Sequence, residues 1–207
     1  MKLLKISILR QSTFKNKKYN LFKIKTNRDF NPLVIGTKIR RNLIKETKGT
    51  KITQASLFVL NKKSKEKLYH SLNEFTNIEE ISEKTNEIIK NLERLKIKLV
   101  NKNLKKKIIC ITLTKENSFF KEIYKTIKIS NLNQKICTIK SHNVEIKLLL
   151  KIEKEKGIKF NPIETINFII PKKNNENNSS LFLETIRNDQ TFTELYQSLK
   201  LIYNQQI

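Results

Sequence analysis

The residues that most often carry chemistry in proteins are few in this chain, and their spacing fits neither a catalytic nor a metal-binding arrangement. His70 and His142 lie in polar segments without a neighbouring serine or cysteine to activate. Cys110 and Cys137 form no C-x-x-C pair, and two cysteines with two scattered histidines are not a metal-ligand set. We therefore expect surface histidines, two buried thiols in a reducing compartment, and no metal or cofactor.

Phosphate-binding loops and acid–base pairs are also missing from the sequence. Its three glycines, Gly36, Gly49 and Gly157, are too few and too far apart for a Walker or dinucleotide-binding loop. Glu79 and Glu80 are adjacent carboxylates, but they stand at the predicted start of a helix, where they complement the helix dipole. The sequence predicts a protein without a catalytic site of its own.

Charge is the strongest compositional feature of the chain. A formal net charge of +24 normally indicates contact with nucleic acid or an anionic membrane surface. However, Lys, Asn and Ile make up 91 of the 207 residues, a bias that codons rich in A and T produce. Only six of the 43 basic residues are Arg, the type that binds phosphate and guanine through two parallel hydrogen bonds. Charge alone leaves both explanations open, nucleic-acid contact and codon bias.

Neither a membrane span nor a secretory signal is visible in the sequence. No run approaches the roughly 18 consecutive apolar residues of a spanning helix. The first ten residues lack the apolar core of a signal peptide and alternate like a strand of the mature fold. We expect a soluble protein made where it works, with one domain or two small subdomains.

Two strands and a helix are predicted at the N-terminal end. Apolar residues alternate over residues 3–9 and 19–26, as in half-buried strands. Pro32 suits the first turn of a helix, which should end near Gly49 in a left-handed glycine cap. Its apolar stripe comprises Ile35, Ile39 and Leu43.

A second helix has the longest apolar pattern of the chain. Thr76 and Glu79 match a capping box, in which a hydroxyl and a carboxylate satisfy the first backbone amides of a helix. Apolar residues then recur at helical spacing for about five turns and end at Leu95. We expect a helix from residue 76 to residue 95.

Most of the remaining chain alternates like strands. Residues 61–67 are expected to form an exposed loop and residues 172–180 a polar connector, and 141–143 should join two strands in a hairpin. Thr191 and Glu194 form another capping box before a C-terminal helix. The predicted strands are 51–60, 96–100, 107–114, 134–140, 143–153, 164–170 and 181–187.

Several short segments from Pro32 onward stand in the order and spacing of one family. They are G-T-K-I-R-R at 36–41, I-T-Q-A at 52–55, L-N-E-F-T-N at 72–77, N-L-E-R-L at 91–95 and P-I-E-T-I-N-F-I-I at 162–170. Together they resemble the N-terminal domain of the alpha subunit of bacterial-type, multisubunit RNA polymerase, with its G-N-A-L-R-R, L-H-E-[FY]-S-T and P-V-E-R-I segments. The sequence departs from the pattern at Glu93, where the family has lysine, and in the stretch after Gly157, which is nearly missing.

The resemblance implies an α+β chain of two subdomains. A dimerisation subdomain, with two helices on a sheet, should comprise residues 1–48 and 162–207. An inserted β-rich subdomain, residues 49–161, should bind partners. Because the chain stops at the last predicted helix, the family's C-terminal DNA-binding domain is expected to be absent, with DNA contacted only indirectly through the complex.

The resemblance also implies a non-catalytic subunit of a DNA-directed RNA polymerase. Such a subunit dimerises and scaffolds assembly of the beta and beta-prime type subunits for transcription, and the nucleotidyltransferase chemistry belongs to those other chains. The resemblance and the codon bias together imply a plastid-encoded protein of the chloroplast stroma. A ribosomal protein of an organelle that binds rRNA is the alternative, and a free nucleic-acid-binding domain is a third. Copurification with large subunits, with rRNA, or with neither separates them.

Two sets of contact residues follow. The apolar stripes of the first and last helices are expected to pair between two copies, although each could instead cover its own sheet. The residues expected at the dimer interface are Ile35, Ile39, Leu43, Leu195, Leu199, Ile202 and Tyr203. The resemblance assigns contacts with the large subunits to Arg40, Arg41, Glu74, Phe75 and Arg94; the first two also suit a helix C-terminus by charge alone.

Overall fold

The computed structural model describes residues 5–14, 17–26, 31–64, 68–101, 103–116, 126–171 and 179–187, and within these ranges it has ten strands and two helices. This content confirms the α+β class. The chain divides into two compact units. The terminal unit is Met1–Gly49 with Lys156–Ile207, and the inserted unit is Thr50–Glu155. The roles assigned to the two predicted subdomains, dimerisation and partner binding, stay predictions.

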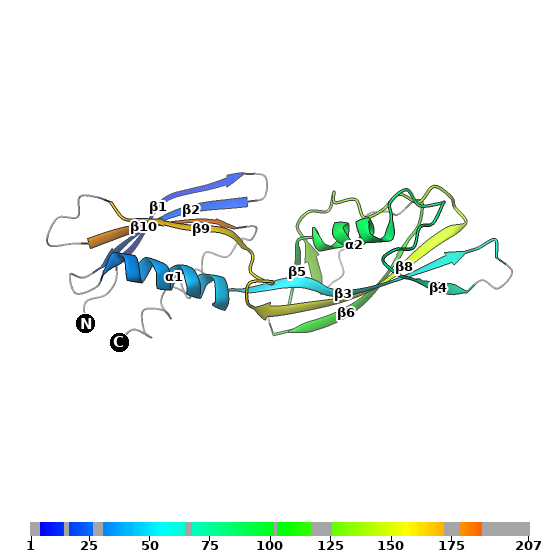
Figure 1. Cartoon of the computed structure of the whole chain (residues 1–207), viewed down its shortest axis with the longest axis horizontal. Helices are drawn as coiled ribbons and strands as arrows, with labels where there is room; N and C mark the ends of the chain where they lie inside the picture. Colours follow the sequence, from blue (N-terminus) through cyan, green and yellow to red (C-terminus); the bar gives the residue numbers. More distant parts are fainter. Residues whose placement is uncertain are drawn as a thin grey trace. The chain divides into compact units, whose positions relative to one another are not determined.

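The terminal unit contains an antiparallel sheet with strand order β1-β2-β10-β9. The register of β1 against β2 shifts between Ile8 and Arg10, which marks a bulge. Helix α1 packs against β9 and β10, as Figure 1 shows. The bounds are β1 Lys5–Phe14, β2 Lys17–Thr26, α1 Pro32–Glu46, β9 Ile163–Ile169 and β10 Ser179–Arg187.

Helix α1 begins where the sequence predicts. Asn31 caps it, because its side-chain oxygen accepts a hydrogen bond from the backbone N–H of Leu33 at 2.9 Å. Gly36 faces β9: a Cβ at this position would lie 2.5 Å from the Phe168 ring, so glycine allows the close approach of helix and strand. The core of this unit consists of Phe22, Ile24, Ile35, Ile39, Leu43, Ile163, Ile166, Leu181 and Leu183.

The end of α1 differs from the prediction. The residue after Glu46 is Thr47, which is extended with φ −70°, so the left-handed cap at Gly49 is wrong. The last carbonyls of the helix are satisfied from a distant segment instead. The side-chain amide of Asn161 donates to the carbonyl oxygens of Leu43 and Ile44, both at 3.0 Å.

Gly49 also contributes to the packing at the end of α1. A Cβ on Gly49 would clash with the carbonyl oxygen of Phe160, so only glycine fits between the start of β3 and the turn at 157–160. Gly157 begins that turn with φ 111°, a conformation that favours glycine. The two glycines therefore let the turn lie against the end of α1.

The inserted unit contains a four-stranded sheet with order β4-β3-β8-β6 and a two-stranded sheet of β5 and β7. Strands β4 and β7, of four and three residues, were not predicted, although β5, also of three residues, lies within the predicted strand 96–100. The bounds are β3 Lys48–Asn61, β4 Tyr69–Leu72, α2 Thr85–Glu93, β5 Ile97–Leu99, β6 Lys106–Leu113, β7 Ile127–Ile129 and β8 Val144–Lys156.

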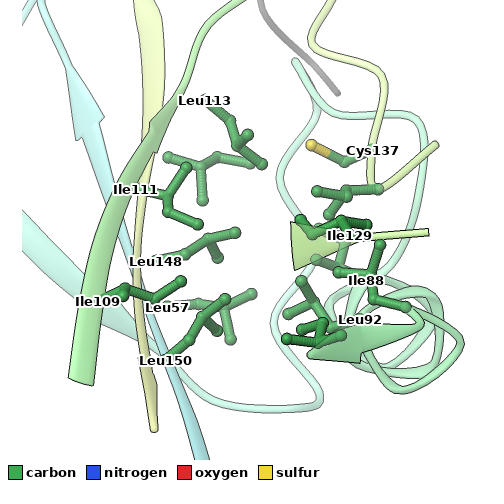
Figure 2. Packing of buried hydrophobic residues seen from close by; sticks show 14 of the residues in the cluster. Leu57, Ile88, Leu92, Ile109, Ile111, Leu113, Ile129, Cys137, Leu148 and Leu150 are labelled. Atoms are coloured by element: carbon green, nitrogen blue, oxygen red, sulfur yellow. The ribbon is translucent and has the colours of Figure 1, made fainter. Parts of the chain in front are cut away.

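The core of the inserted unit lies between the four-stranded sheet and the layer that contains α2 and β7. Figure 2 shows Ile111 and Leu148 on the sheet side pointing toward Ile88 and Leu92 of α2. All four are buried. Alternate residues of β8, from Val144 to Ile152, are almost completely inaccessible, which is the period-2 pattern of a strand with one buried face.

Helix α2 begins at Thr85 rather than at Thr76, so the predicted capping box of Thr76 and Glu79 is wrong. The backbone before the helix is used in pairing with a distant segment. Ile81 forms an isolated bridge with Ile139, and hydrogen bonds on either side join residues 80 and 82 to residues 140 and 138. Extended pairing and helix need different backbone angles, so the tertiary contact overrides the local capping signal.

The observed helix start uses a different carboxylate. The Glu87 side chain accepts a hydrogen bond from the backbone N–H of Lys84 at 3.2 Å, which satisfies an amide at the first turn. Glu79 and Glu80 lie in a turn several residues earlier. Their predicted role at a helix dipole is therefore wrong.

The predicted strand at 134–140 and its hairpin with 143–153 are also wrong. Apart from the bridge at Ile139, this segment is irregular, and β8 pairs with β6 and β3 instead. Side chains hold the segment in place. The Glu83 carboxylate accepts from the backbone N–H and the hydroxyl of Thr138, at 2.5 and 2.7 Å, and Asn91 donates to the carbonyl of Ile136 at 3.0 Å.

The cysteines differ from each other. Cys137 is buried as expected, and burial raises the pKa of its thiol to about 12. Cys110 is exposed, so its predicted burial is wrong: the alternation of β6 turns Ile109 and Ile111 toward the core and Cys110 away from it. His70 and His142 are both exposed, which confirms the prediction for the histidines.

Candidate partner-binding surfaces

Arg40 and Arg41 are exposed in the third turn of α1. Their neighbours Ile39 and Leu43 are buried in the sheet, so helical spacing turns the two guanidinium groups away from the core. Near a helix C-terminus a cation gains about 0.3–1 kcal/mol from the helix dipole. Only Lys45 is basic in the last turn of α1, so this gain is small for Arg40 and Arg41, and their role in binding a partner stays a prediction.

The apolar stripe of α1 is covered within its own unit. Ile35, Ile39 and Leu43 pack against the sheet, and all three are at most 5% exposed. The stripe of α1 therefore covers its own sheet, and its part in a dimer stays a prediction. The exposed apolar residues of α1 are Leu33 and Val34, in its first turn. The other residues expected at a dimer interface, Leu195, Leu199, Ile202 and Tyr203, lie outside the described residues, as do the predicted C-terminal helix and most of the polar connector.

Glu74 and Phe75 occupy a tight turn between β4 and α2. The side chain of Asn73 organises this turn: its oxygen accepts from the backbone N–H of Phe75 at 3.1 Å and from the hydroxyl of Thr76 at 2.7 Å. The Thr76 hydroxyl in turn accepts from the backbone N–H of Asn73 at 3.2 Å. The ring of Phe75 is nevertheless 82% exposed. An aromatic side chain is thus exposed to water on a turn that these three hydrogen bonds close.

The same turn is attached to the beginning of α2. The hydroxyl of Thr85, the first residue of the helix, donates to the carbonyl of Thr76 at 2.6 Å. Thr85 is buried, so this hydrogen bond is protected from water. The position of Phe75 is therefore fixed relative to α2.

Arg94 stands at the other end of α2. Its backbone N–H donates to the carbonyl of Lys90 at 3.3 Å, and its own carbonyl accepts from the side chain of Asn131 at 3.1 Å. Asn131 also accepts from the N–H of Lys96 at 2.7 Å, so it fixes the chain as it leaves the helix. The Arg94 side chain is exposed.

The predicted large-subunit contacts are divided between the two units. Phe75 and Arg94 lie at opposite ends of α2, a helix of nine residues and therefore about 13 Å long. Arg40 and Arg41 belong to the terminal unit, whereas Glu74, Phe75 and Arg94 belong to the inserted unit. Among the described residues, no helix is long and apolar enough to span a membrane.

Comparison with known proteins gives the family. No family model matches the chain. The chain is 40% identical over 190 residues to the DNA-directed RNA polymerase subunit alpha of Euglena longa, covering 84% of this chain and 85% of that one. It is 30% identical over 190 residues to the subunit of the same name from Euglena gracilis, covering 88% and 87%, and 29% identical over 211 residues to that of Euglena viridis, covering 98% and 97%. These matches agree with the order of motifs along the chain, and this chain belongs to the family of DNA-directed RNA polymerase alpha subunits.

Proposed function

We propose that this chain is a non-catalytic assembly platform, two copies of which hold the beta and beta-prime type large subunits of a plastid DNA-directed RNA polymerase. The names of the relatives support the enzyme, and the A- and T-coded composition together with the Euglena source of the relatives supports the plastid. The nucleotide- and metal-binding chemistry would lie on the large subunits. DNA would meet this chain only as part of the complex.

The exposed ring of Phe75 is the observation that carries the proposal. A phenylalanine side chain that is 82% exposed leaves most of its apolar surface in water, although hydrogen bonds close the turn that holds it. A pocket in a partner would remove that surface from water at about 25 cal/mol per Å². Because the backbone of the turn is already fixed, little further entropy would be lost on binding. These are the properties of an interface anchor residue.

The charged residues would complete the contacts. Arg40 and Arg41 can each bind a carboxylate through two parallel hydrogen bonds, and Arg94 can do so from the end of α2. Removing one side of a buried charge pair costs about 2–5 kcal/mol of binding free energy. We propose that these arginines meet acidic side chains of the large subunits.

The test is co-expression of the chain with both large subunits, followed by affinity purification. Phe75→Ser should lower recovery of a large subunit about 10- to 30-fold, the effect of losing a hot-spot side chain. The matched control is Phe14→Ser, which alters an aromatic residue of β1 that is 70% exposed in the terminal unit. Equal recovery with Phe75→Ser and with the unchanged chain would contradict the assignment of Phe75, and failure of the unchanged chain to recover either large subunit would contradict the platform itself.

The dimer requires a separate measurement. Leu199→Asp would place an unpaired carboxylate in the proposed helix contact, at a cost of several kcal/mol. Sedimentation should then show monomers where the unchanged chain gives dimers, with the circular dichroism spectrum unaltered. A variant that still sediments as a dimer would exclude the C-terminal helix from the contact.

A further inference from the structure

The four-stranded sheet of the inserted unit has one face in the core and a second face that the core does not use. Ile109 and Ile111 of β6 and Leu148 and Leu150 of β8 point toward α2 and β7, as Figure 2 shows. Successive side chains of a strand point to opposite faces. Cys110, between the two isoleucines, and Leu149, between the two leucines, therefore lie on the outer face of the sheet.

Apolar side chains meet on that outer face where β8 pairs with the edge strand β6. In the pairing of β6 with β8, Cys110 lies directly opposite Leu149, and Ile108 lies opposite Lys151. Ile108 is 62% exposed and Leu149 is 42% exposed, and Cys110 is also exposed. An antiparallel sheet with water on one side normally places polar side chains there. We call Ile108, Cys110 and Leu149, with the bordering Lys147 and Lys151, the outer β6–β8 surface.

The border of this surface carries an excess of positive charge. The Glu153 carboxylate is shared by Lys151 at 3.2 Å and Lys106 at 3.4 Å, so two ammonium groups face one anion. The Lys147 ammonium lies 5.2 Å from the centre of the Tyr69 ring, a cation–π contact that leaves its charge uncompensated. An anionic group placed beside Lys147 and Lys151 would meet a favourable potential.

We propose that the outer β6–β8 surface docks another protein subunit whose own surface has an aliphatic centre bordered by carboxylates. Aliphatic side chains of the partner would cover Ile108 and Leu149, and its carboxylates would pair with Lys147 and Lys151. An apolar centre with a charged rim is the usual anatomy of a protein–protein interface. This inference rests on the proposed function, which makes other subunits of the polymerase the available partners.

The chemistry of the centre selects a protein over a nucleic acid. Single-stranded nucleic acids bind to aromatic stacking platforms inside cationic grooves, and duplexes are held mainly through their phosphates. A phosphate group makes no favourable contact with an aliphatic side chain. Bound phosphates would therefore leave Ile108 and Leu149 exposed to water, or would lose hydration against them without a compensating contact. Carboxylates and aliphatic groups occur side by side on protein surfaces. Such a surface matches both the aliphatic centre and the lysine border of the outer β6–β8 surface.

Cys110 provides a reporter at the centre of the surface. The tagged chain would be purified alone and within the complex of large subunits, with and without nuclease treatment, and exposed to N-ethylmaleimide for increasing times. Mass spectrometry of peptides would give the rate at which Cys110 is modified. Cys137 is an internal control in the same chain, because its thiol is buried and its pKa is about 12. It should stay unmodified in both samples.

We expect modification of Cys110 to be at least about tenfold slower in the nuclease-treated complex than in the isolated chain. Equal rates in the two samples, with large subunits present, would overturn this inference and leave the platform function standing. Protection that disappears with nuclease would overturn it in favour of nucleic acid. If no large subunit is recovered, the proposed function fails and this inference fails with it.

Substitutions on the surface give a second measurement. Leu149→Asn and Lys147→Glu change side chains outside the core, so both variants should keep the circular dichroism spectrum of the unchanged chain. Leu132→Asn and Lys63→Glu are matched controls, since they make the same changes at exposed positions outside the four-stranded sheet. In competition with the unchanged chain for incorporation into the complex, each surface variant should lose about fivefold or more and each control should compete equally. Equal competition by the surface variants would overturn the inference.

Discussion

The two compact units bury different kinds of residue. In the inserted unit the buried set is hydrophobic with one exception among the described residues, Thr85, whose hydroxyl donates to the carbonyl of Thr76. In the terminal unit four polar side chains are buried beside the apolar core. Thr185 lies opposite Asn20 in the pairing of β10 with β2, and Arg187 is the next residue on the same face of β10. The remaining one is Thr47, at the end of α1.

Because their buried residues differ, the two units are stabilised in different ways. Burying apolar surface is favourable in every arrangement that excludes water, whereas a buried polar group costs free energy unless it is hydrogen-bonded. Apolar packing is therefore the main source of stability of the inserted unit. In the terminal unit Leu181 and Leu183 of β10 belong to the apolar core, whereas the buried hydroxyl of Thr185, which has no hydrogen-bond partner among the described residues, offsets part of the stability. Matched substitutions in the two units should therefore act differently.

The largest expected effect comes from a cavity in the inserted unit. Leu148 of β8 is fully buried in the core between the four-stranded sheet and α2, so Leu148→Ala should lower the free energy of unfolding of that unit by about 2–5 kcal/mol. Calorimetry of the full chain would show whether one or two transitions exist. We expect the transition of the inserted unit alone to move. A loss below about 1 kcal/mol would mean that apolar packing does not dominate there.

A steric change in the terminal unit should have an intermediate effect. In Gly36→Ala the new methyl group would lie against the Phe168 ring and push α1 from β9, at a cost of about 1–3 kcal/mol. Phe168→Leu in the same chain provides the control, since the smaller side chain should recover part of the loss. Urea titration would measure both. If the double variant is no more stable than Gly36→Ala, the close approach of helix and strand is not the cause.

A matched pair of threonines tests the comparison most directly. Thr85→Val should destabilise the inserted unit by about 1–2 kcal/mol, because the carbonyl of Thr76 loses its donor. The buried hydroxyl of Thr185 has no hydrogen-bond partner among the described residues, so Thr185→Val should be neutral or should stabilise the terminal unit by up to about 1 kcal/mol. Urea titrations of both variants decide the matter. The same sign for both substitutions would remove the distinction between the two cores.

The two helices show which parts of the fold the sequence could predict. For α1, the cap at Asn31, the proline at the first position and the apolar stripe act within one segment, and its start and buried face are confirmed. For α2 the local pattern was stronger, yet the predicted first turns were wrong, because Ile81 pairs with Ile139, 58 residues away. A contact at that separation leaves no trace in a local periodicity.

The candidate surfaces show a similar limit. The motif around Phe75 could be found from the sequence, but the exposure of its ring depends on hydrogen bonds that Asn73 makes in the folded turn. Cys110 was predicted to be buried because its segment is apolar on both sides. Which face of β6 meets the core depends on its pairing with β8, and the sequence of β6 alone does not specify that choice.

A smaller effect concerns acid stability of the inserted unit. The hydrogen bond from Lys151, with those from Thr53 and Lys106, holds the pKa of Glu153 below its ordinary value of 4.5. A carboxylate with a lowered pKa in the folded state adds stability above its unfolded pKa and loses it as the pH falls through the folded value. The melting temperature of this unit should therefore fall below about pH 4.5 less steeply in Glu153→Gln than in the unchanged chain. Parallel curves would exclude Glu153 as a source of acid sensitivity.

The smallest expected effect is the alkaline counterpart in the terminal unit. The hydrogen bond between Tyr19 and Glu184, assisted by burial and by the negative charge of Glu184, raises the pKa of Tyr19 above its ordinary value of 10.0. Folding thus favours the protonated phenol, so this contribution is complete below about pH 10 and is lost as the pH rises through the folded value. Tyr19→Phe should lower the melting temperature of the terminal unit slightly at neutral pH and make its decline above about pH 10 less steep. The transition of the inserted unit should be the same in both chains over this range. A change in that transition instead would show that the two units do not unfold separately, and the contrast between their cores would then have to be measured on the chain as a single cooperative structure.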